Sequence, residues 1–177
     1  PWLLLVGAAA IAAAVLYTGG PKPYGYHGLG ELMVLVFFGF VATAGSAYVQ
    51  LERVPEAAWW SSLTVGLLAC AILVTNNLRD IDGDSAAGKR TLAVRVGRDH
   101  TKSLYLACVA VAFGAVIVVS VDHIGALAAL LAFPLAIEPA RIVVRAASPP
   151  ELVRALVTTA RLQLVVGALL AVGLWLS

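Results

Sequence analysis

The stretch Asn76-Asn77-Leu78-Arg79-Asp80-Ile81-Asp82-Gly83-Asp84-Ser85-Ala86-Ala87-Gly88-Lys89-Arg90-Thr91 follows a long apolar run and holds most of the polar chemistry of the chain. Five acids or amides and three cations lie within it. Carboxylates four residues apart, followed by cations, suit a membrane enzyme that binds magnesium and a diphosphate. The stretch therefore marks both the end of an apolar helix and a candidate site.

The composition around this stretch is that of a membrane protein. Of the 177 residues 61% are hydrophobic and only 12% are charged, with a mean hydropathy of +0.93. A soluble domain carries about twice that charge. Cys70 and Cys108 lie inside apolar runs and are expected to be packing residues, not a disulfide or metal pair. We expect the lipid bilayer as surroundings and no nucleic-acid partner.

Six apolar stretches approach the length that a membrane span needs, roughly 20 helical residues for a hydrocarbon core about 30 Å thick. Backbone groups in lipid must pair internally, so these stretches are expected to be helices. The sequence therefore predicts an all-α, polytopic transmembrane helix bundle, a single domain over residues 1–177. The predicted spans are 2–17, 31–49, 57–78, 102–120, 124–145 and 151–176, and the connector after the third span is predicted to cover 79–101.

Charge and aromatic residues predict the same direction for these spans. If 79–101 is cytoplasmic, the four tryptophans fall at the outer ends of spans, where an interfacial belt is expected. Ten of the twelve lysines and arginines then fall at the cytoplasmic end, as the positive-inside pattern requires. These cations are Lys22, Arg79, Lys89, Arg90, Arg95, Arg98, Lys102, Arg141, Arg145 and Arg154.

The spacing of Asp80 and Asp84 predicts a shared helix face if the third helix continues one turn past Leu78, and Asn76 joins them there. Carboxylate and amide oxygens suit Mg²⁺, which prefers oxygen ligands and keeps part of its water. The cations Arg79, Lys89 and Arg90 can meet phosphate oxygens.

The alternative for this stretch is a solvated loop of mixed charge, although three neighbouring aspartates repel one another unless a cation lies among them. A calcium loop starting at Asp80 is excluded. It would need glycine at position 6 and glutamate at position 12, where the chain has Ser85 and Thr91.

The pattern Asn76-Asn77-x-Arg79-Asp80-x-x-x-Asp84-x-x-Ala87-Gly88-Lys89-Arg90-Thr91-Leu92 resembles the second aspartate motif of the UbiA-type intramembrane prenyltransferases. The branch that it resembles most acts on 1,4-dihydroxy-2-naphthoate in menaquinone biosynthesis. The stretch from Tyr17 to Tyr26, with Gly30 and Glu31, is similar to the preceding cytoplasmic loop of that branch. The resemblance covers most of the chain.

The resemblance implies nine helices and two aspartate motifs, of which the first precedes the region similar to this chain. The six predicted spans match the last six of the nine. With a start at Pro1, this leads us to expect a C-terminal piece of a longer protein. The piece would need the missing N-terminal helices as partner and would be inactive alone.

The activity implied by the resemblance is Mg²⁺-dependent transfer of a polyprenyl group from polyprenyl diphosphate to the naphthoate, giving demethylmenaquinone in the bacterial inner membrane, with the active side cytoplasmic. Asp80 and Asp84 would then bind metal with support from Asn76. The implied diphosphate ligands are Arg79, Lys89, Arg90 and Lys22. The implied pocket residues are Tyr17, Tyr24, Asn77 and Arg161.

Several of these pocket assignments have a plain alternative. Tyr17 and Tyr24 either face the allylic cation through their rings or are ordinary interfacial tyrosines. Arg161 lies deep in the sixth span, so its charge is expected to face protein or water. It either pairs with Glu138 or anchors the carboxylate of the acceptor.

Without the resemblance, the residues leave two alternative functions of other classes, a small membrane transporter and a non-catalytic scaffold subunit. A small membrane transporter would use intramembrane Glu138 and Arg161, but it should show paired interrupted helices, which the sequence lacks. A non-catalytic scaffold subunit is the other alternative, because half of the catalytic set implied by the resemblance is missing from the chain.

Overall fold

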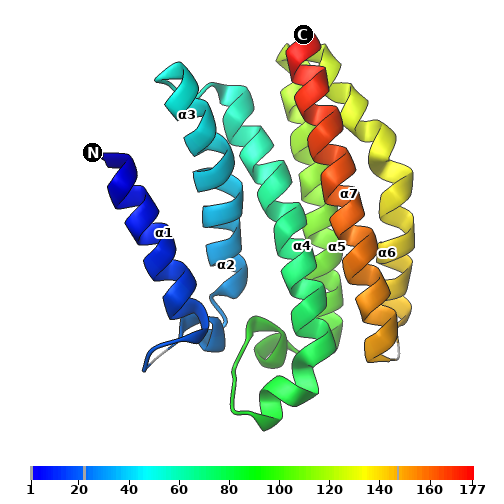
Figure 1. Ribbon diagram of the computed structural model, residues 1–177. Coiled ribbons are helices and arrows are strands. Elements are labelled where there is room, and N and C mark those ends of the chain that lie inside the picture. Colours follow the sequence, from blue (N-terminus) through cyan, green and yellow to red (C-terminus); the bar gives the residue numbers. More distant parts are fainter. Residues whose placement is uncertain (1, 22, 147) are drawn as a thin grey trace.

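The computed structural model describes residues 2–21, 23–146 and 148–177, and these form a bundle of long helices (Figure 1). Some helical segments follow one another without a break and form one continuous rod. Residues 30–51 form such a rod from α2, η2 and α3, and residues 124–145 form another from η3 and α6. The elements in chain order are α1 (Trp2–Thr18), η1 (Tyr24–His27), α2 (Gly30–Val34), η2 (Leu35–Ala44), α3 (Gly45–Leu51), α4 (Glu56–Ala86), α5 (Leu92–Asp122), η3 (Ile124–Ala132), α6 (Phe133–Arg145) and α7 (Pro149–Leu176).

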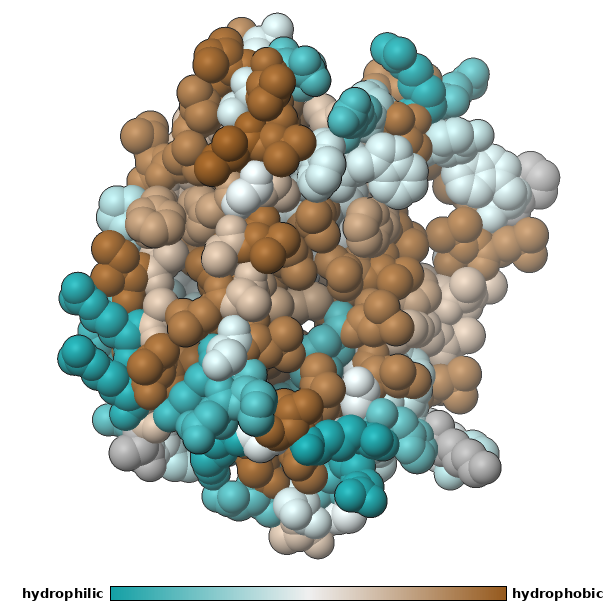
Figure 2. Space-filling view, turned by 180° about the vertical axis from the view of Figure 1, so that it is seen from behind, coloured by the Kyte–Doolittle hydropathy of each residue, from teal (hydrophilic) through white to brown (hydrophobic). Residues whose placement is uncertain are grey.

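Five of the rods are long and apolar enough to cross a membrane. They span 30–51, 56–86, 92–122, 124–145 and 149–176, while α1 is an apolar helix of 17 residues. Hydrophobic side chains cover most of the middle of the surface in Figure 2, and many of the hydrophilic ones gather towards one end. The prediction of an all-α transmembrane bundle is confirmed.

Helix α4 lies at the centre of the bundle. It packs against α5 and α7 on one side and against α2 and η2 on the other, while α7 also packs against η3 and α6. Helix α1 stands at the edge of the row in Figure 1, beyond α2, and none of its residues is buried. The elements packed around α4 therefore fall into two sets, α5 with α7 and α2 with η2, and α1 lies beyond the second set.

The crossing of η2 and α4 depends on two glycines. A Cβ on Gly66 would lie 2.8 Å from the Cα of Gly39, closer than such atoms approach in real proteins. The missing side chains let the two backbones pack directly, as small residues do at membrane helix interfaces. On the other side of α4, the buried hydroxyls of Tyr105 and Thr159 join α5 to α7 by a hydrogen bond of 2.9 Å.

The tryptophans lie away from the acidic stretch. The ring of Trp2 is 5.2 Å from that of Tyr48, and the ring of Trp59 is 6.0 Å from that of Phe40, near the ends of α3 and α4 that face away from residue 86. The opposite end of the bundle holds η1, residues 79–98 and the start of α7, and we call it the charged end. This arrangement agrees with the alternation predicted for the spans.

The connector predicted over 79–101 is wrong in its bounds, because α4 continues to Ala86. A turn follows, and then a short helical segment from Leu92 that a kink at Gly97 (φ 82°, ψ 172°) separates from the long part of α5. The predicted connector contains no proline, and its polar side chains do not prevent a helix that has left the apolar layer. Gly88 ends the helix in the left-handed conformation (φ 73°), and its N–H donates to the carbonyl of Ser85. Thr91 then caps α5, accepting from the N–H of Val94.

Candidate functional site

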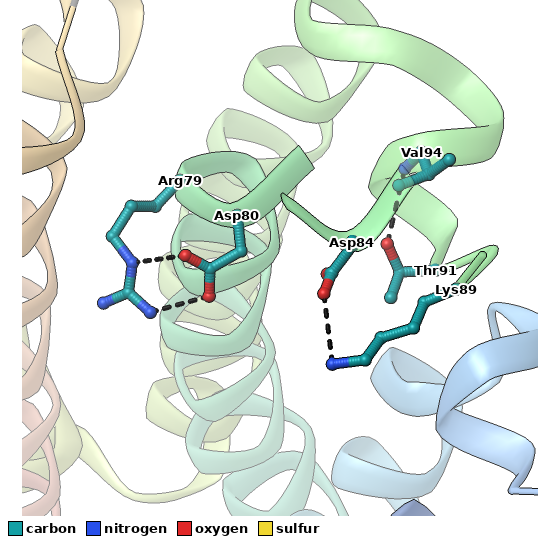
Figure 3. A network of polar contacts seen from close by, with 6 residues as sticks. All are labelled: Arg79, Asp80, Asp84, Lys89, Thr91 and Val94. Atoms are coloured by element: carbon teal, nitrogen blue, oxygen red, sulfur yellow. Dashed lines mark hydrogen bonds and ion pairs between the residues drawn. The ribbon is translucent and has the colours of Figure 1, made fainter. Parts of the chain in front are cut away.

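The last turns of α4 carry Asp80, which is held by its chain neighbour Arg79. Both oxygens of the Asp80 carboxylate accept from the guanidinium, each at 2.7 Å, in the two-pronged geometry drawn in Figure 3. Helix α4 extends past Leu78, which is the condition for Asp80 and Asp84 to share a helix face. Arg79, for which a diphosphate-binding role is predicted, pairs in this structure with the first carboxylate of the stretch.

Asp84 lies one turn further along and is paired with Lys89. The Lys89 ammonium is 3.3 Å from the Asp84 carboxylate, and the side chain of Asp84 is only 14% exposed. The turn brings the two together, because the N–H of Lys89 donates to the Asp84 carbonyl at 2.8 Å. The same ammonium lies over the ring of Tyr26, 5.0 Å from its centroid.

Asp82 differs from its two neighbours. Its side chain is 86% exposed and pairs with Arg98 of α5 at 2.7 Å. Helical spacing turns it away from the face shared by Asp80 and Asp84. Each of the three aspartates thus has a cation of the same chain beside it, which removes the repulsion expected among them.

Two turns meet at the charged end and bring Tyr26 to the acidic stretch. The N–H of Arg90 donates to the Tyr26 carbonyl at 3.0 Å, and the guanidinium of Arg95 donates to the Arg90 carbonyl at 2.9 Å. Gly28 has a left-handed conformation (φ 77°), and a Cβ there would lie 3.2 Å from the Arg95 side chain. The loop after α1 is therefore docked on the turn that follows α4.

An apolar cavity of about 600 Å³ lies between α1, the α2–η2 rod and α4. Tyr17 and Tyr24 line it together with Gly30 and Leu73, and the two tyrosine rings are 5.5 Å apart. The hydroxyl of Tyr24 donates to the Ala13 carbonyl at 2.8 Å. Burial raises the pKa of Tyr24, so this phenol stays neutral. The structure thus brings both predicted pocket tyrosines to one apolar hollow near the charged end.

Glu31 is a residue of this region to which the sequence assigned no role in the site. One of its carboxylate oxygens accepts from the Asn77 side-chain amide at 2.9 Å, and its carbonyl accepts from the Cys70 thiol at 3.1 Å. The other carboxylate oxygen is buried and has no hydrogen-bond partner in the described structure. The available signal was an acid at the start of an apolar span, where an ionisable residue indicates function.

Other predicted site residues lie apart from this group or outside it. Asn76 is half-buried on α4, and Lys22 lies outside the described residues. Arg161 is exposed on α7, and the part of the chain that the structure describes gives it no hydrogen bond or ion pair. Its expected pairing with Glu138 is wrong, because Arg154, two turns earlier on α7, takes that carboxylate.

The acids do not form a ready metal cage. Within residues 2–21, 23–146 and 148–177, no three His, Cys, Asp or Glu side chains are grouped closely enough to hold a metal ion. The geometry offers instead two carboxylates on the last turns of one helix, with cations in contact with them. Such a set can exchange its own cations for a metal ion and an anionic ligand.

The sequence of this chain is similar to those of a known protein family and of several curated proteins. Residues 1–164 match the model of the UbiA prenyltransferase family. A 1,4-dihydroxy-2-naphthoate octaprenyltransferase of Mycobacterium tuberculosis is 49% identical over 140 residues, which cover 79% of this chain and 48% of that protein. Proteins of the same name in Mycobacterium leprae and Escherichia coli are 43% and 38% identical, each over 98% of this chain and 58% of their own length.

The chain thus spans about half the length of the curated relatives it matches. No solved structure matches it.

Proposed function

Because the chain belongs to the UbiA prenyltransferase family, we propose that the whole protein transfers a polyprenyl group from a polyprenyl diphosphate to 1,4-dihydroxy-2-naphthoate. The prenyl group replaces the carboxyl group of the acceptor, so diphosphate and CO2 leave, and the product is the quinol form of demethylmenaquinone. The family supports the reaction class, and the names of the similar proteins support the acceptor. The chain described here supplies one acidic stretch and one apolar cavity. The remaining length of the relatives would supply the rest of the site.

Asp80 and Asp84 fit a magnesium ion shared with a diphosphate. Mg²⁺ in phosphate sites is bound through one or two carboxylates, with waters and substrate oxygens completing its shell, so a complete protein cage is not needed. Asn76, half-buried on the same helix, would support the two carboxylates. Bound there, the ion would offset the negative charge that develops on the departing diphosphate.

The cations beside the aspartates have a second task in this proposal. When metal and diphosphate enter, Arg79 and Lys89 exchange their carboxylate partners for phosphate oxygens, Arg79 with its planar fork and Lys89 as a point charge. Arg90 is exposed and its backbone is fixed against the loop after α1, so its side chain is free to join them. Lys22 of that loop is proposed as a fourth phosphate ligand.

The apolar cavity suits the polyprenyl chain. A hollow of about 600 Å³ lined by alanines, phenylalanines and aliphatic side chains gives the isoprenoid a dry path beside the charged end. Tyr17 and Tyr24 stand where the apolar lining meets the polar groups, and their ring faces can stabilise positive charge on the allylic carbon. Asn77, which donates to Glu31, is proposed as a further substrate-pocket residue. Arg161 is proposed to bind the acceptor carboxylate in the complete protein.

We propose that the charged end faces the cytoplasm of a bacterial inner membrane. The proposal rests on the concentration of lysine and arginine at that end, as positive-inside orientation requires. Polyprenyl diphosphate would then enter from the bilayer with its headgroup at the cytoplasmic surface.

The observation that carries the proposal is the placement of Asp80 and Asp84 on the last turns of α4, near an apolar cavity at the same end of the bundle. The test is a prenyl-transfer assay on the whole protein with Asp80→Ala and Asp84→Ala. Asp82→Ala is the matched control, because that carboxylate points outward and is 86% exposed. Loss of product in the first two variants with retention in the control supports the proposal. Unchanged Mg²⁺-dependent product formation in both Asp80→Ala and Asp84→Ala would refute it.

A further inference from the structure

Glu31 has a buried hydrogen-bond acceptor without a donor. Its side chain is 9% exposed, and the Asn77 amide fixes one carboxylate oxygen at 2.9 Å. The second oxygen has no partner among the described residues. An unpaired polar group at such a place costs free energy, and in native proteins it calls for a specific explanation.

The position of this oxygen suggests what it serves. Gly30, the preceding residue, lines the apolar cavity together with Tyr17. Asn77 is on α4 one turn deeper than Asp80, so Glu31 lies beneath the proposed diphosphate site, towards the interior of the bundle. The phenol of Tyr17 is within electrostatic range of both Glu31 and Asp84, which joins the three groups into one region.

We propose that the free oxygen of Glu31 accepts a hydrogen bond from a ring hydroxyl of the aromatic acceptor. This inference rests on the proposed function. With the diphosphate at the charged end and the isoprenoid in the cavity, the allylic carbon lies between them, and the acceptor ring must reach that level. Its hydroxyl is a donor that needs a buried acceptor there, and Glu31 offers one.

The hydrogen bond would also aid the chemistry. It leaves the proton on the hydroxyl but increases the electron density of the ring, which attacks the allylic carbon. The oxygen is covered in this structure, and the side chain of Tyr17 lies over the neighbouring Gly30: a Cβ there would be 3.5 Å from the Tyr17 hydroxyl.

The test uses Glu31→Gln in the whole protein. Glutamine keeps the shape and the oxygen that accepts from Asn77, but it puts an amide donor where the free oxygen was. We expect kcat/KM for the acceptor to fall about 10- to 100-fold, the range for a lost hydrogen bond to a charged group. The KM for polyprenyl diphosphate should stay within about twofold, a split that a general loss of structure would not produce. Glu52→Gln is the control, since Glu52 is exposed beyond the far end of the same rod.

Two monomethyl ethers of the acceptor provide a second arm. With the wild-type protein, kcat/KM for one of the ethers should be lower than that for the parent acceptor by about the factor that Glu31→Gln causes with the parent acceptor. For that same ether, replacing the wild type by Glu31→Gln should lower kcat/KM little further. The inference would be overturned if Glu31→Gln lowered kcat/KM for both ethers by the same further factor relative to the wild type. It would also be overturned if Glu31→Gln left the acceptor kinetics unchanged. Absence of any prenyl transfer by the wild type would instead refute the proposed function.

Discussion

Lys89 is predicted to affect the binding of metal and of diphosphate in opposite directions. In the structure its ammonium neutralises Asp84 at 3.3 Å, whereas in the proposed reaction the same charge contacts the diphosphate. Lys89→Met keeps the length of the side chain and removes both interactions. Mg²⁺ alone should then bind more tightly, and polyprenyl diphosphate should bind more weakly.

The expected magnitudes differ. The ammonium side chain is 34% exposed, so its pair with Asp84 is worth no more than about 1 kcal/mol, and Mg²⁺ affinity should rise by at most about fivefold. A charge-assisted contact to phosphate is worth about 1.5–3 kcal/mol, so the KM for the diphosphate should rise about 10- to 150-fold.

Two measurements check this prediction. Calorimetric titration with Mg²⁺ in the absence of diphosphate gives the first effect, and steady-state prenyl transfer gives the second. Lys102→Met is the control, because Lys102 is also at the charged end but donates to the Val144 carbonyl. If Lys89→Met weakens the binding of both Mg²⁺ and polyprenyl diphosphate, or changes the binding of neither, Lys89 does not exchange partners and the reasoning fails.

Three further predictions concern packing and metal dependence. Gly66→Val should destabilise the bundle by about 1–3 kcal/mol or prevent folding, because its side chain would overlap the backbone of Gly39; thermal unfolding in detergent measures this, and a wild-type melting temperature would contradict it. Tyr105→Phe should cost about 1–2 kcal/mol, because it leaves the Thr159 hydroxyl with one partner fewer; Thr159→Val measured alone and together with it gives the coupling, which should vanish if the hydrogen bond is absent. Chelation of divalent metal should abolish prenyl transfer and added Mg²⁺ should restore it, whereas full activity under chelation would exclude the assigned role of Asp84.

Much of the fold follows from the sequence because lipid restricts the backbone to helices. Every predicted span corresponds to a helical rod, and the predicted alternation agrees with the acidic stretch and two of the tryptophans lying at opposite ends of the bundle. The direction of the bundle across the membrane stays a prediction. The end of α4 was less predictable. Hydropathy detects where a helix leaves the apolar layer, near Leu78, but it does not detect that the helix continues in water to Ala86.

The partners within the site were harder to predict than its members. Arg79 and Asp80 are adjacent, and neighbours on a helix do not normally face each other, so no spacing rule indicates their bidentate pair. The contact of Glu31 with Asn77 joins residues 46 positions apart, and only the packing of α2 on α4 creates it. The assignment of metal and diphosphate ligands stays a prediction, although Asp80, Asp84 and Lys89 do lie together.

The most direct measurement is the position of a metal ion in the whole protein. Mn²⁺ substituted for Mg²⁺, with a non-hydrolysable polyprenyl diphosphate analogue bound, can be located by anomalous diffraction. The account predicts metal within about 2.2 Å of carboxylate oxygens of Asp80 and Asp84, with Arg79 and Lys89 turned to the phosphates. The account would be contradicted if metal and diphosphate were bound elsewhere while Asp80 stayed paired with Arg79 and Asp84 with Lys89.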